Sequence, residues 1–314
     1  MPASTNWTAA DLPDLTGKVF LVTGGNSGLG LETARELARK GGHVVIACRD
    51  TGKAAAALDD LRASAPKVSA EALRLDLASL ASVRAFADAF RGGHTRLDAL
   101  CNHAGVMALP YRKTADGFEM QLGTNHLGHF ALTGCLLDVL RATPGARVVN
   151  VSSTMHRIGR MRFDDLQSER SYAKWPAYGQ SKLANLLFTY ELARRAEKAT
   201  LNLTSVAAHP GYAATNLQTA GPRMEGAALM ERLSLLGNRL FAQTAAMGAL
   251  PTIYAAAAPG VRGGDYYGPS SVGEMWGSPK QVRSSGRSRD LEAAARLWRV
   301  SEELTGVSFP GLAG

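Results

Sequence analysis

The chain contains few cysteines and no long uninterrupted apolar run. Its 314 residues include only Cys48, Cys101 and Cys135, which are widely spaced and form no Cys-x-x-Cys pair. This usage predicts buried thiols in a reducing compartment, and we expect neither disulfides nor a metal site. No run of 18 uncharged apolar residues occurs, so no membrane-spanning helix is predicted. Residues 1–17 lack the basic and apolar regions of a secretory signal, and we therefore expect a cytoplasmic protein.

The chain also lacks internal repeats, dense blocks of one charge and a Pro/Gly/Ser-rich linker. The net charge of +8 raises the question of nucleic-acid binding, but basic and acidic residues are interleaved along the chain, so no such partner is expected. Three arginines in residues 281–290 are interpreted as part of a solvated loop, with anion or partner binding as the lesser alternative. We expect one domain over 1–314, with an N-terminal extension (1–17), a lid segment on the substrate side (212–241) and a C-terminal helix and tail (289–314).

The sequence does contain a regular alternation of apolar strands and amphipathic helices. Strands are predicted at 18–25, 43–50, 68–77, 97–105, 146–153 and 202–211, with a short one at 264–268. Helices are predicted at 29–40, in the Ala-rich stretch that follows the second strand and ends at about residue 63, and at 79–90, 115–141, 178–197, 239–257 and 290–304. This order predicts an α/β fold, a single-domain Rossmann-type doubly wound parallel sheet with helices on both faces.

A glycine-rich loop follows the first predicted strand. The stretch VTGGNSGLG places Gly24, Gly28 and Gly30 between that strand and the first helix. Backbone without Cβ atoms can approach a pyrophosphate closely, and the helix amino end offers free N–H groups and a positive dipole. The loop therefore predicts a dinucleotide site.

The end of the second predicted strand bears on which dinucleotide binds. An acid at this place would bond an adenosine ribose, whereas an arginine would accept its 2′-phosphate. The sequence supplies Arg49, then Asp50, and Lys53 shortly after. Arg49 favours NADP(H) over NAD(H), while Asp50 has the alternative of capping the next helix.

Tyr178 and Lys182 lie four residues apart at the start of a predicted helix, so both side chains can point the same way. A free tyrosine has a pKa near 10. An ammonium about 4 Å away is worth up to roughly 4 kcal/mol at an effective dielectric constant of about 20. Even half of that energy would lower the phenol pKa by about one to two units, which would suit an acid–base group. Alone, such a pair is mostly a matter of chance, and an ordinary helix face explains it.

Together, these segments resemble the short-chain dehydrogenase/reductase family over nearly the whole chain. The resemblance is carried by the glycine loop, LeuAspLeu (75–77), AsnHisAlaGly (102–105), NHLGHF (125–130), NVSS (150–153), the Tyr178–Lys182 pair and HisProGlyTyr (209–212). It implies four catalytic residues: Asn125, Ser153, Tyr178 and Lys182. It implies cofactor contacts from Gly24, Asn26, Ser27, Gly28, Leu29, Gly30, Arg49, Lys53, Asp76, Leu77, Asn102, Ala104, Gly105, Tyr178, Lys182, Pro210, Gly211 and Thr215.

Two departures from the family pattern are visible. His103 replaces the second asparagine of the strand-four motif, and Ser153 and Tyr178 are 25 residues apart, more than is usual for the family. The long interval, together with NHLGHF, is similar to the retinol dehydrogenase and light-dependent protochlorophyllide reductase branch. His126 and His129 of that motif are interpreted as packing or surface residues, and His209 is expected to bond backbone near the cofactor loop.

The resemblance implies an NADP(H)-dependent oxidoreductase that interconverts an alcohol and a carbonyl, with Tyr178 as acid/base. Ser153 would bond the substrate oxygen, Lys182 would hold ribose hydroxyls, and Asn125 would support a water. The long insert between Ser153 and Tyr178 (154–177) and the apolar residues of 224–241 favour a bulky apolar substrate. A structural role for the apolar residues is about as plausible. A non-catalytic dinucleotide sensor or scaffold and a pigment- or retinoid-specific reductase are the alternatives. A homodimer or homotetramer is possible.

Overall fold

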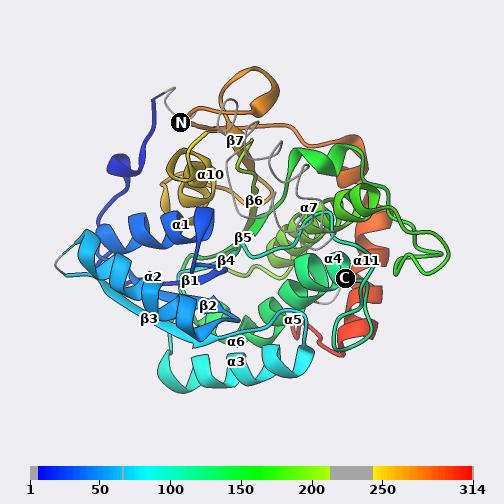
Figure 1. Ribbon diagram of the computed structural model, residues 1–314, viewed down its shortest axis with the longest axis horizontal. Helices are drawn as coiled ribbons and strands as arrows, with labels where there is room; N and C mark the ends of the chain where they lie inside the picture. Colours follow the sequence, from blue (N-terminus) through cyan, green and yellow to red (C-terminus); the bar gives the residue numbers. More distant parts are fainter. Residues whose placement is uncertain (1–5, 66, 213–242, 313–314) are drawn as a thin grey trace.

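One eight-stranded sheet organises the described part of the chain (Figure 1). The computed structural model describes residues 6–65, 67–212 and 243–312. The strands are β1 Val19–Thr23, β2 His43–Cys48, β3 Ser69–Arg74, β4 Ala99–Asn102, β5 Ala146–Val151, β6 Leu203–Ala208, β7 Tyr266–Pro269 and β8 Pro279–Gln281. They lie in the order β3-β2-β1-β4-β5-β6-β7-β8. Strands β1 to β7 are parallel, and β8 pairs with β7 in the antiparallel direction.

Helices cover both faces of this sheet (Figure 1). One face carries α1 Gly28–Arg39, α2 Thr51–Ser64 and α10 Ala245–Ala257. The other carries α3 Leu80–Gly93, α5 Gly128–Cys135, α6 Leu137–Ala142, α7 Lys174–Lys198 and α11 Leu291–Thr305. The predicted doubly wound α/β fold is thereby confirmed.

Alternation along the strands divides the apolar side chains between two cores. In β1, Phe20 and Val22 face the α1/α10 layer, whereas Leu21 between them faces the α3/α5 layer. Successive strand residues point to opposite faces, so a strand covered on both sides has to be apolar throughout. This explains why the central strands appear in the sequence as continuous apolar runs rather than as alternating ones.

The order of the strands determines where a ligand site can form. The chain runs outward from β1 through β2 to β3, returns to β4 beside β1, and then runs the other way. The connections that follow β1 and β4 therefore leave on opposite faces and separate at the carboxyl ends of these strands. Such a switch point is the usual place for a ligand crevice in an open α/β sheet.

The predicted helix over 115–141 is wrong in its start and in its continuity. Helix α4 begins only at Met120, a π-helical segment covers Gly123–Leu127, and a break at Leu136 separates α5 from α6. The start is set by Glu119, whose carboxylate accepts hydrogen bonds from the N–H groups of Gln121 and Leu122. The π-helical turn lies at Asn125, one of the predicted site residues.

Smaller differences occur at the edges of the fold. Helix α7 begins at Lys174, four residues before its predicted start, and the α10 helix begins at Ala245 rather than at 239. Strand β8 was not predicted. Most of the predicted lid segment (212–241), including Thr215 and the apolar residues of 224–241, lies outside the described residues. Among the helices that the structure describes, none is long and apolar enough to cross a membrane.

Candidate active site

The loop between β1 and α1 is built for close backbone approach. A Cβ atom on Gly30 would lie less than 3.0 Å from the carbonyl of Gly24, so only glycine allows the loop to close on the helix. Gly28 has a positive φ of 54°, and a Cβ there would meet only open space. Ser27, the N-cap residue of α1, makes no capping bond with its side chain. The loop and helix end thus present N–H groups and a positive dipole to an anion.

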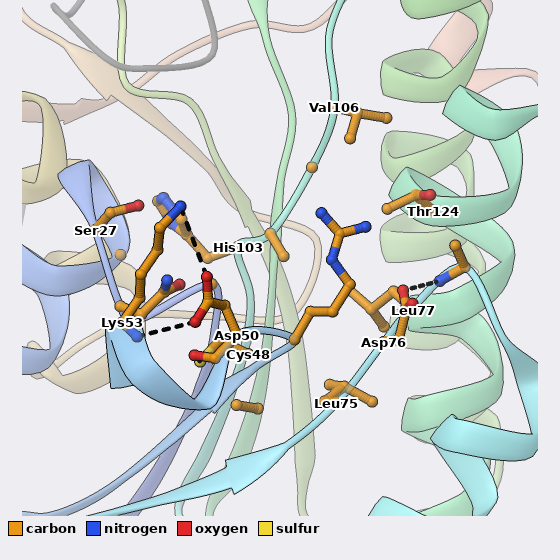
Figure 2. Close-up of a pocket in the computed structure, with 18 of the residues that line it drawn as sticks. Ser27, Cys48, Asp50, Lys53, Leu75, Asp76, Leu77, His103, Val106 and Thr124 are labelled. Carbon is orange, nitrogen blue, oxygen red and sulfur yellow. Dashed lines mark hydrogen bonds and ion pairs between the residues drawn. The ribbon is translucent and has the colours of Figure 1, made fainter. Parts of the chain in front are cut away.

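A cleft of about 380 Å³ opens above this loop (Figure 2). It is lined by most of the predicted cofactor residues: Gly24, Asn26, Ser27, Gly28, Leu29, Gly30, Arg49, Lys53, Asp76, Leu77, Ala104 and Gly105. The prediction did not include several other lining residues: Ala47, Cys48, Asp50, Leu75, Ala78, His103, Val106, Met120 and Thr124. The segments after β1, β2, β3 and β4 thus meet at the expected switch point.

At one end of the cleft, Asp50 has a structural role. Its carboxylate accepts a hydrogen bond of 3.0 Å from the N–H of Lys53 and caps α2, and the Lys53 ammonium lies 3.8 Å from the same group. This bears out the alternative role for Asp50. Arg49 and Lys53 remain on the cleft wall as positive charges. The side chain of Asp76, on the neighbouring segment, accepts a hydrogen bond from the N–H of Ala78 (Figure 2).

Thr23 joins the ends of β1 and β4. Its hydroxyl oxygen accepts hydrogen bonds of 2.9 Å from the N–H groups of both His103 and Ala104. Asn102 lies deeper, where its amide donates to Asn150 and Thr133, and it does not line the cleft. Asn102 therefore connects β4 to β5 and α5, and its predicted cofactor contact stays a prediction.

His103 takes the place of an asparagine in the resembling motif and lines the cleft. Burial and the nearby charge of Lys182 lower its pKa to about 4, so the imidazole is neutral at pH 7. Its Nδ1 atom is buried and has no hydrogen-bond partner among the described residues. A buried polar atom without a partner at a ligand cleft fits the presence of a polar ligand. The glycine loop and this orphaned nitrogen both suit a dinucleotide.

Asn125 lies in the π-helical turn and holds the segment after β4. Its Oδ1 accepts from the N–H of Val106 at 2.7 Å, and its Nδ2 donates to the Val106 carbonyl and to the hydroxyl of Ser181. A Cβ on Gly105 would be 3.0 Å from Asn125 Oδ1 and 3.5 Å from Lys182 Nζ. Asn125 and Lys182 therefore lie directly behind the part of the cleft wall formed by Gly105.

Tyr178, Lys182 and Ser153 meet where α7 crosses the end of β5. The Lys182 ammonium donates to the carbonyl of Val151 at 3.1 Å and lies 5.7 Å from the centre of the Tyr178 ring. The Ser153 side chain lies near the Tyr178 phenol, where it acts to lower the pKa of that group. The structure thus brings together the four residues predicted to be catalytic, on the inner side of the cleft.

The expected lowering of the Tyr178 pKa is wrong for the protein without a cofactor. Burial raises the pKa of Tyr178 to about 12, which outweighs the opposing effect of Ser153. Burial also lowers the pKa of Lys182 to about 8. The estimate from sequence considered the attraction between the two charges and left out the cost of removing both groups from water. Both side chains are buried, so desolvation dominates.

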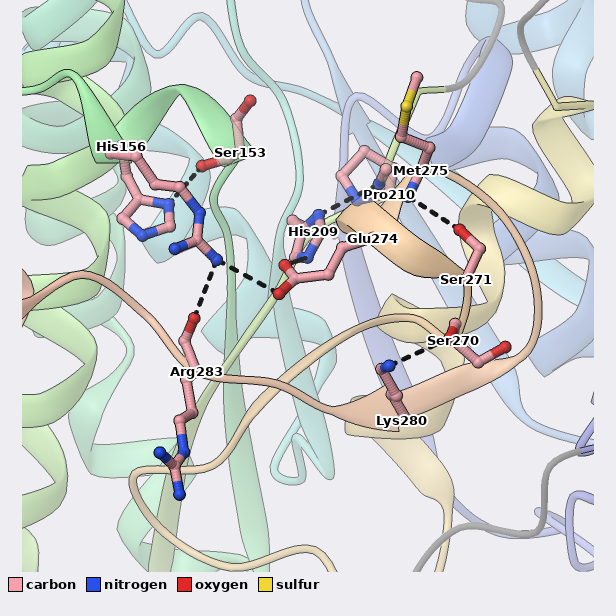
Figure 3. A network of polar contacts seen from close by, with 12 residues as sticks. Ser153, His156, His209, Pro210, Ser270, Ser271, Glu274, Met275, Lys280 and Arg283 are labelled. Carbon is pink, nitrogen blue, oxygen red and sulfur yellow. Dashed lines mark hydrogen bonds and ion pairs between the residues drawn. The ribbon is translucent and has the colours of Figure 1, made fainter.

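A polar network holds the predicted cofactor segment at 209–211 (Figure 3). His209 Nδ1 accepts from the N–H of Gly211, as expected for a histidine bonding backbone, and Nε2 lies 3.0 Å from the carboxylate of Glu274. Arg157 bonds the other oxygen of Glu274 at 3.2 Å. Sequence reasoning missed Glu274 and Arg157, because no local pattern joins positions 117 residues apart.

His126 and His129 are buried structural residues, as predicted for packing. His129 bonds the carbonyl of Asn125 through Nδ1 and the hydroxyl of Thr23 through Nε2. His126 bonds the hydroxyl of Ser301 on α11. Burial lowers the pKa of each to about 3, so both are neutral at pH 7. His129 thereby links the π-helical turn to the loop end of β1.

The fold and the site together define a Rossmann-type α/β protein whose cleft suits a dinucleotide. Residues 18–226 match the family model for short chain dehydrogenases. The chain belongs to this family, whose members use NAD(P) cofactors, and alcohol–carbonyl interconversion is the reaction class that follows.

Within the family, the chain is similar to retinol dehydrogenases. It is 44% identical to human retinol dehydrogenase 12 over 297 residues, which cover 94% of this chain and 88% of that protein. It is 42% identical to human retinol dehydrogenase 14 over 304 residues, with 93% and 87% covered. The chain thus belongs to the retinol dehydrogenase branch, as the resemblance predicted.

Solved structures agree with this placement. An uncharacterised protein from Mycobacterium paratuberculosis is 44% identical with a TM-score of 0.80, covering 98% of this chain and all of that one. The NADP complex of RhlG from Pseudomonas aeruginosa is 25% identical with a TM-score of 0.61, over 81% of this chain and 94% of that one.

Proposed function

We propose that the protein is an NADP(H)-dependent oxidoreductase that interconverts an alcohol and a carbonyl on a bulky apolar substrate. The observation that carries the proposal is the meeting of Tyr178, Ser153 and Lys182 behind Gly105, at the inner end of a cleft lined by the glycine loop. The bound nicotinamide would supply or accept the hydride, and the protein would orient the substrate and move the proton.

Tyr178 and Ser153 act on the substrate oxygen. In reduction, the Tyr178 hydroxyl gives its proton to the carbonyl oxygen, and in oxidation the phenolate takes the proton of the alcohol. The Ser153 hydroxyl, which lies near the phenol, donates to the same oxygen and stabilises its developing charge. The pKa of about 12 for Tyr178 suits a proton donor, whereas proton removal requires extra positive charge near the ring.

Lys182 and Asn125 support this pair. The Lys182 ammonium uses one hydrogen on the Val151 carbonyl and has two left for ribose hydroxyls. Its charge favours the phenolate form of Tyr178 when the cofactor excludes water. Asn125 fixes Val106 on the segment after β4 and supports the water that joins Lys182 to solvent.

Arg49 and Lys53 support the choice of NADP(H), because a 2′-phosphate at the end of β2 would meet both charges while Asp50 is occupied by its cap. Arg49→Ala should weaken NADPH binding about 10- to 100-fold, the loss of one charge-assisted hydrogen bond. NADH binding should change little. Fluorescence titration of both nucleotides measures this, with Arg62→Ala on α2 as the matched control. Equal affinities for NADPH and NADH in the wild type would contradict the assignment of NADP(H) as the cofactor.

An apolar substrate is supported by Trp175, one turn before Tyr178 on α7. Its ring lies edge-on to Tyr178 at 6.5 Å and is 44% exposed, so it offers an apolar surface next to the reacting group. The retinol dehydrogenases among the relatives make retinaldehyde the first compound to test.

A turnover screen decides the substrate class. With NADPH, retinaldehyde, long-chain aldehydes and bulky ketones should be reduced with a kcat/KM at least 10-fold above that for short polar carbonyls. Trp175→Ala should raise KM for the apolar substrates more than for the small ones. Turnover restricted to small polar carbonyls would contradict the proposal.

A further inference from the structure

Two histidines and a glutamate converge at the edge of the sheet opposite the cofactor cleft. His43 is the first residue of β2, Glu71 lies on β3, and His94 is the C-cap residue of α3. One ligand atom from each lies within 4.8 Å of the other two. The cofactor cleft lies at the carboxyl ends of the strands, whereas β2 begins at His43, so the cluster belongs to a different site.

The fold explains this convergence. In the β2–β3 register, His43 lies opposite Ser69 and Val45 lies opposite Glu71. Residues two apart on a strand share a face, so His43 and Glu71 point to the same side of the sheet. Val45 packs in the core on the α3 side, which identifies that face. Helix α3 ends on the same side and supplies His94.

The donor atoms lie close together, and both imidazoles bond the same carboxylate oxygen. Glu71 Oε1 lies 2.5 Å from His94 Nε2 and 3.4 Å from His43 Nε2. In a tetrahedral zinc site with bonds of about 2.0–2.1 Å, ligand atoms are roughly 3.3 Å apart. Only a small movement of the Glu71 side chain, away from His94, is needed to open that space. Two imidazoles and one carboxylate form a ligand set typical of zinc sites that keep a position for water.

The surroundings hold both rings in place. His43 Nδ1 lies 2.7 Å from the hydroxyl of Ser69, the kind of outer partner that orients a metal-bound imidazole. The His94 ring packs on Phe90 at 4.6 Å, and the backbone N–H of His94 donates to the Phe90 carbonyl. The side chains of His94, His43 and Glu71 are 14%, 29% and 42% exposed, so an ion has an entry path.

We propose that His43, Glu71 and His94 form a Zn²⁺ site that fastens the end of α3 to β2 and β3. The site contains no cysteine. The expectation that no metal binds rested on cysteine spacing, so it did not cover a site of two histidines and a glutamate. The ion would join α3 to β2 and β3 and keep its fourth position for water, at a distance from the cofactor cleft. Zinc binding therefore stabilises the folded chain and leaves NADPH affinity unchanged.

The test is zinc titration of the full-length, tag-free protein after treatment with a chelator. Calorimetry should show one Zn²⁺ per chain, and zinc at about 100 times Kd should raise Tm by roughly 5 °C, whereas Mg²⁺ should not. Glu71→Gln and His94→Gln should weaken zinc binding at least 10-fold and abolish the Tm shift. The exposed acid Asp59 gives the matched control, since Asp59→Asn should behave as wild type.

Ser69→Ala keeps all three ligands, so it tests the site even if the Glu71 or His94 variant fails to fold. It should weaken binding about 10-fold with its fold intact, the usual cost of losing an outer partner. Absence of one-to-one binding would show that the three side chains form only a hydrogen-bonded cluster. Wild-type affinity in Glu71→Gln and His94→Gln, with loss in Cys135→Ser, would assign the zinc to the thiol and overturn the proposal.

Discussion

Lys182 is a buried cation whose ammonium donates a hydrogen bond to the Val151 carbonyl. Burial lowers its pKa to about 8, from about 10.4 in an unfolded chain. Between these values the unfolded chain binds a proton that the folded one does not. The free energy of unfolding therefore decreases as pH falls from about 10.5 to 8, and this loss persists at lower pH. Placing this charge behind the cleft costs stability at neutral pH.

Replacement of this lysine should separate stability from activity. Lys182→Met should abolish turnover and weaken cofactor binding, yet raise the free energy of unfolding at pH 7 by on the order of 1–3 kcal/mol. The gain should shrink towards zero at pH 10.5, where the folded-state lysine is neutral and the unfolded-state lysine is about half neutral. Urea unfolding at the two pH values measures this, with the exposed Lys198→Met on the same helix as control. An equal destabilisation at both pH values would contradict the account.

At the scale of elements, the junction of β1 and α1 depends on backbone contact. The position of Gly30 allows the first turn of α1 to lie against the Gly24 carbonyl, which no side chain would permit. Gly92 on α3 differs, because a Cβ there meets nothing within 4 Å. The two helical glycines thus have opposite consequences when a methyl group is added.

Gly30→Ala should lower the free energy of unfolding by about 1–3 kcal/mol through overpacking and weaken NADPH binding, since the loop has to move. Gly92→Ala should leave binding unchanged and stabilise the protein by about 0.5–1 kcal/mol, because glycine is a poor helix former. Thermal unfolding and nucleotide titration of the two variants provide the comparison. Unchanged NADPH affinity in Gly30→Ala would show that the loop does not form the cofactor site.

Elements with strong local patterns could be predicted from the sequence, and those set by distant contacts could not. Apolar strands alternating with amphipathic helices suffice for the doubly wound sheet. The π-helical turn at Asn125 could not be predicted, since it accompanies bonds to Val106 and Ser181 from other segments. Strand β8 has no apolar alternation, and only its pairing with β7 defines it.

For the whole molecule, motifs at the ends of strands predicted residues that the structure brings together, because a parallel sheet brings those ends to one edge. The pKa values did not follow, because they depend on burial. The Arg157–Glu274–His209 network also needed the structure. The single domain, the oligomeric state and the cytoplasmic location remain predictions.

The central claim is that the fold places Tyr178 to exchange a proton with the substrate oxygen. Tyr178→Phe removes one oxygen and keeps the ring that packs against Trp175. With saturating NADPH and the best carbonyl substrate of the screen, kcat should fall by at least two orders of magnitude. The Kd for NADPH and the Tm should stay close to wild type. A Tyr178→Phe protein with near-normal kcat would contradict the account.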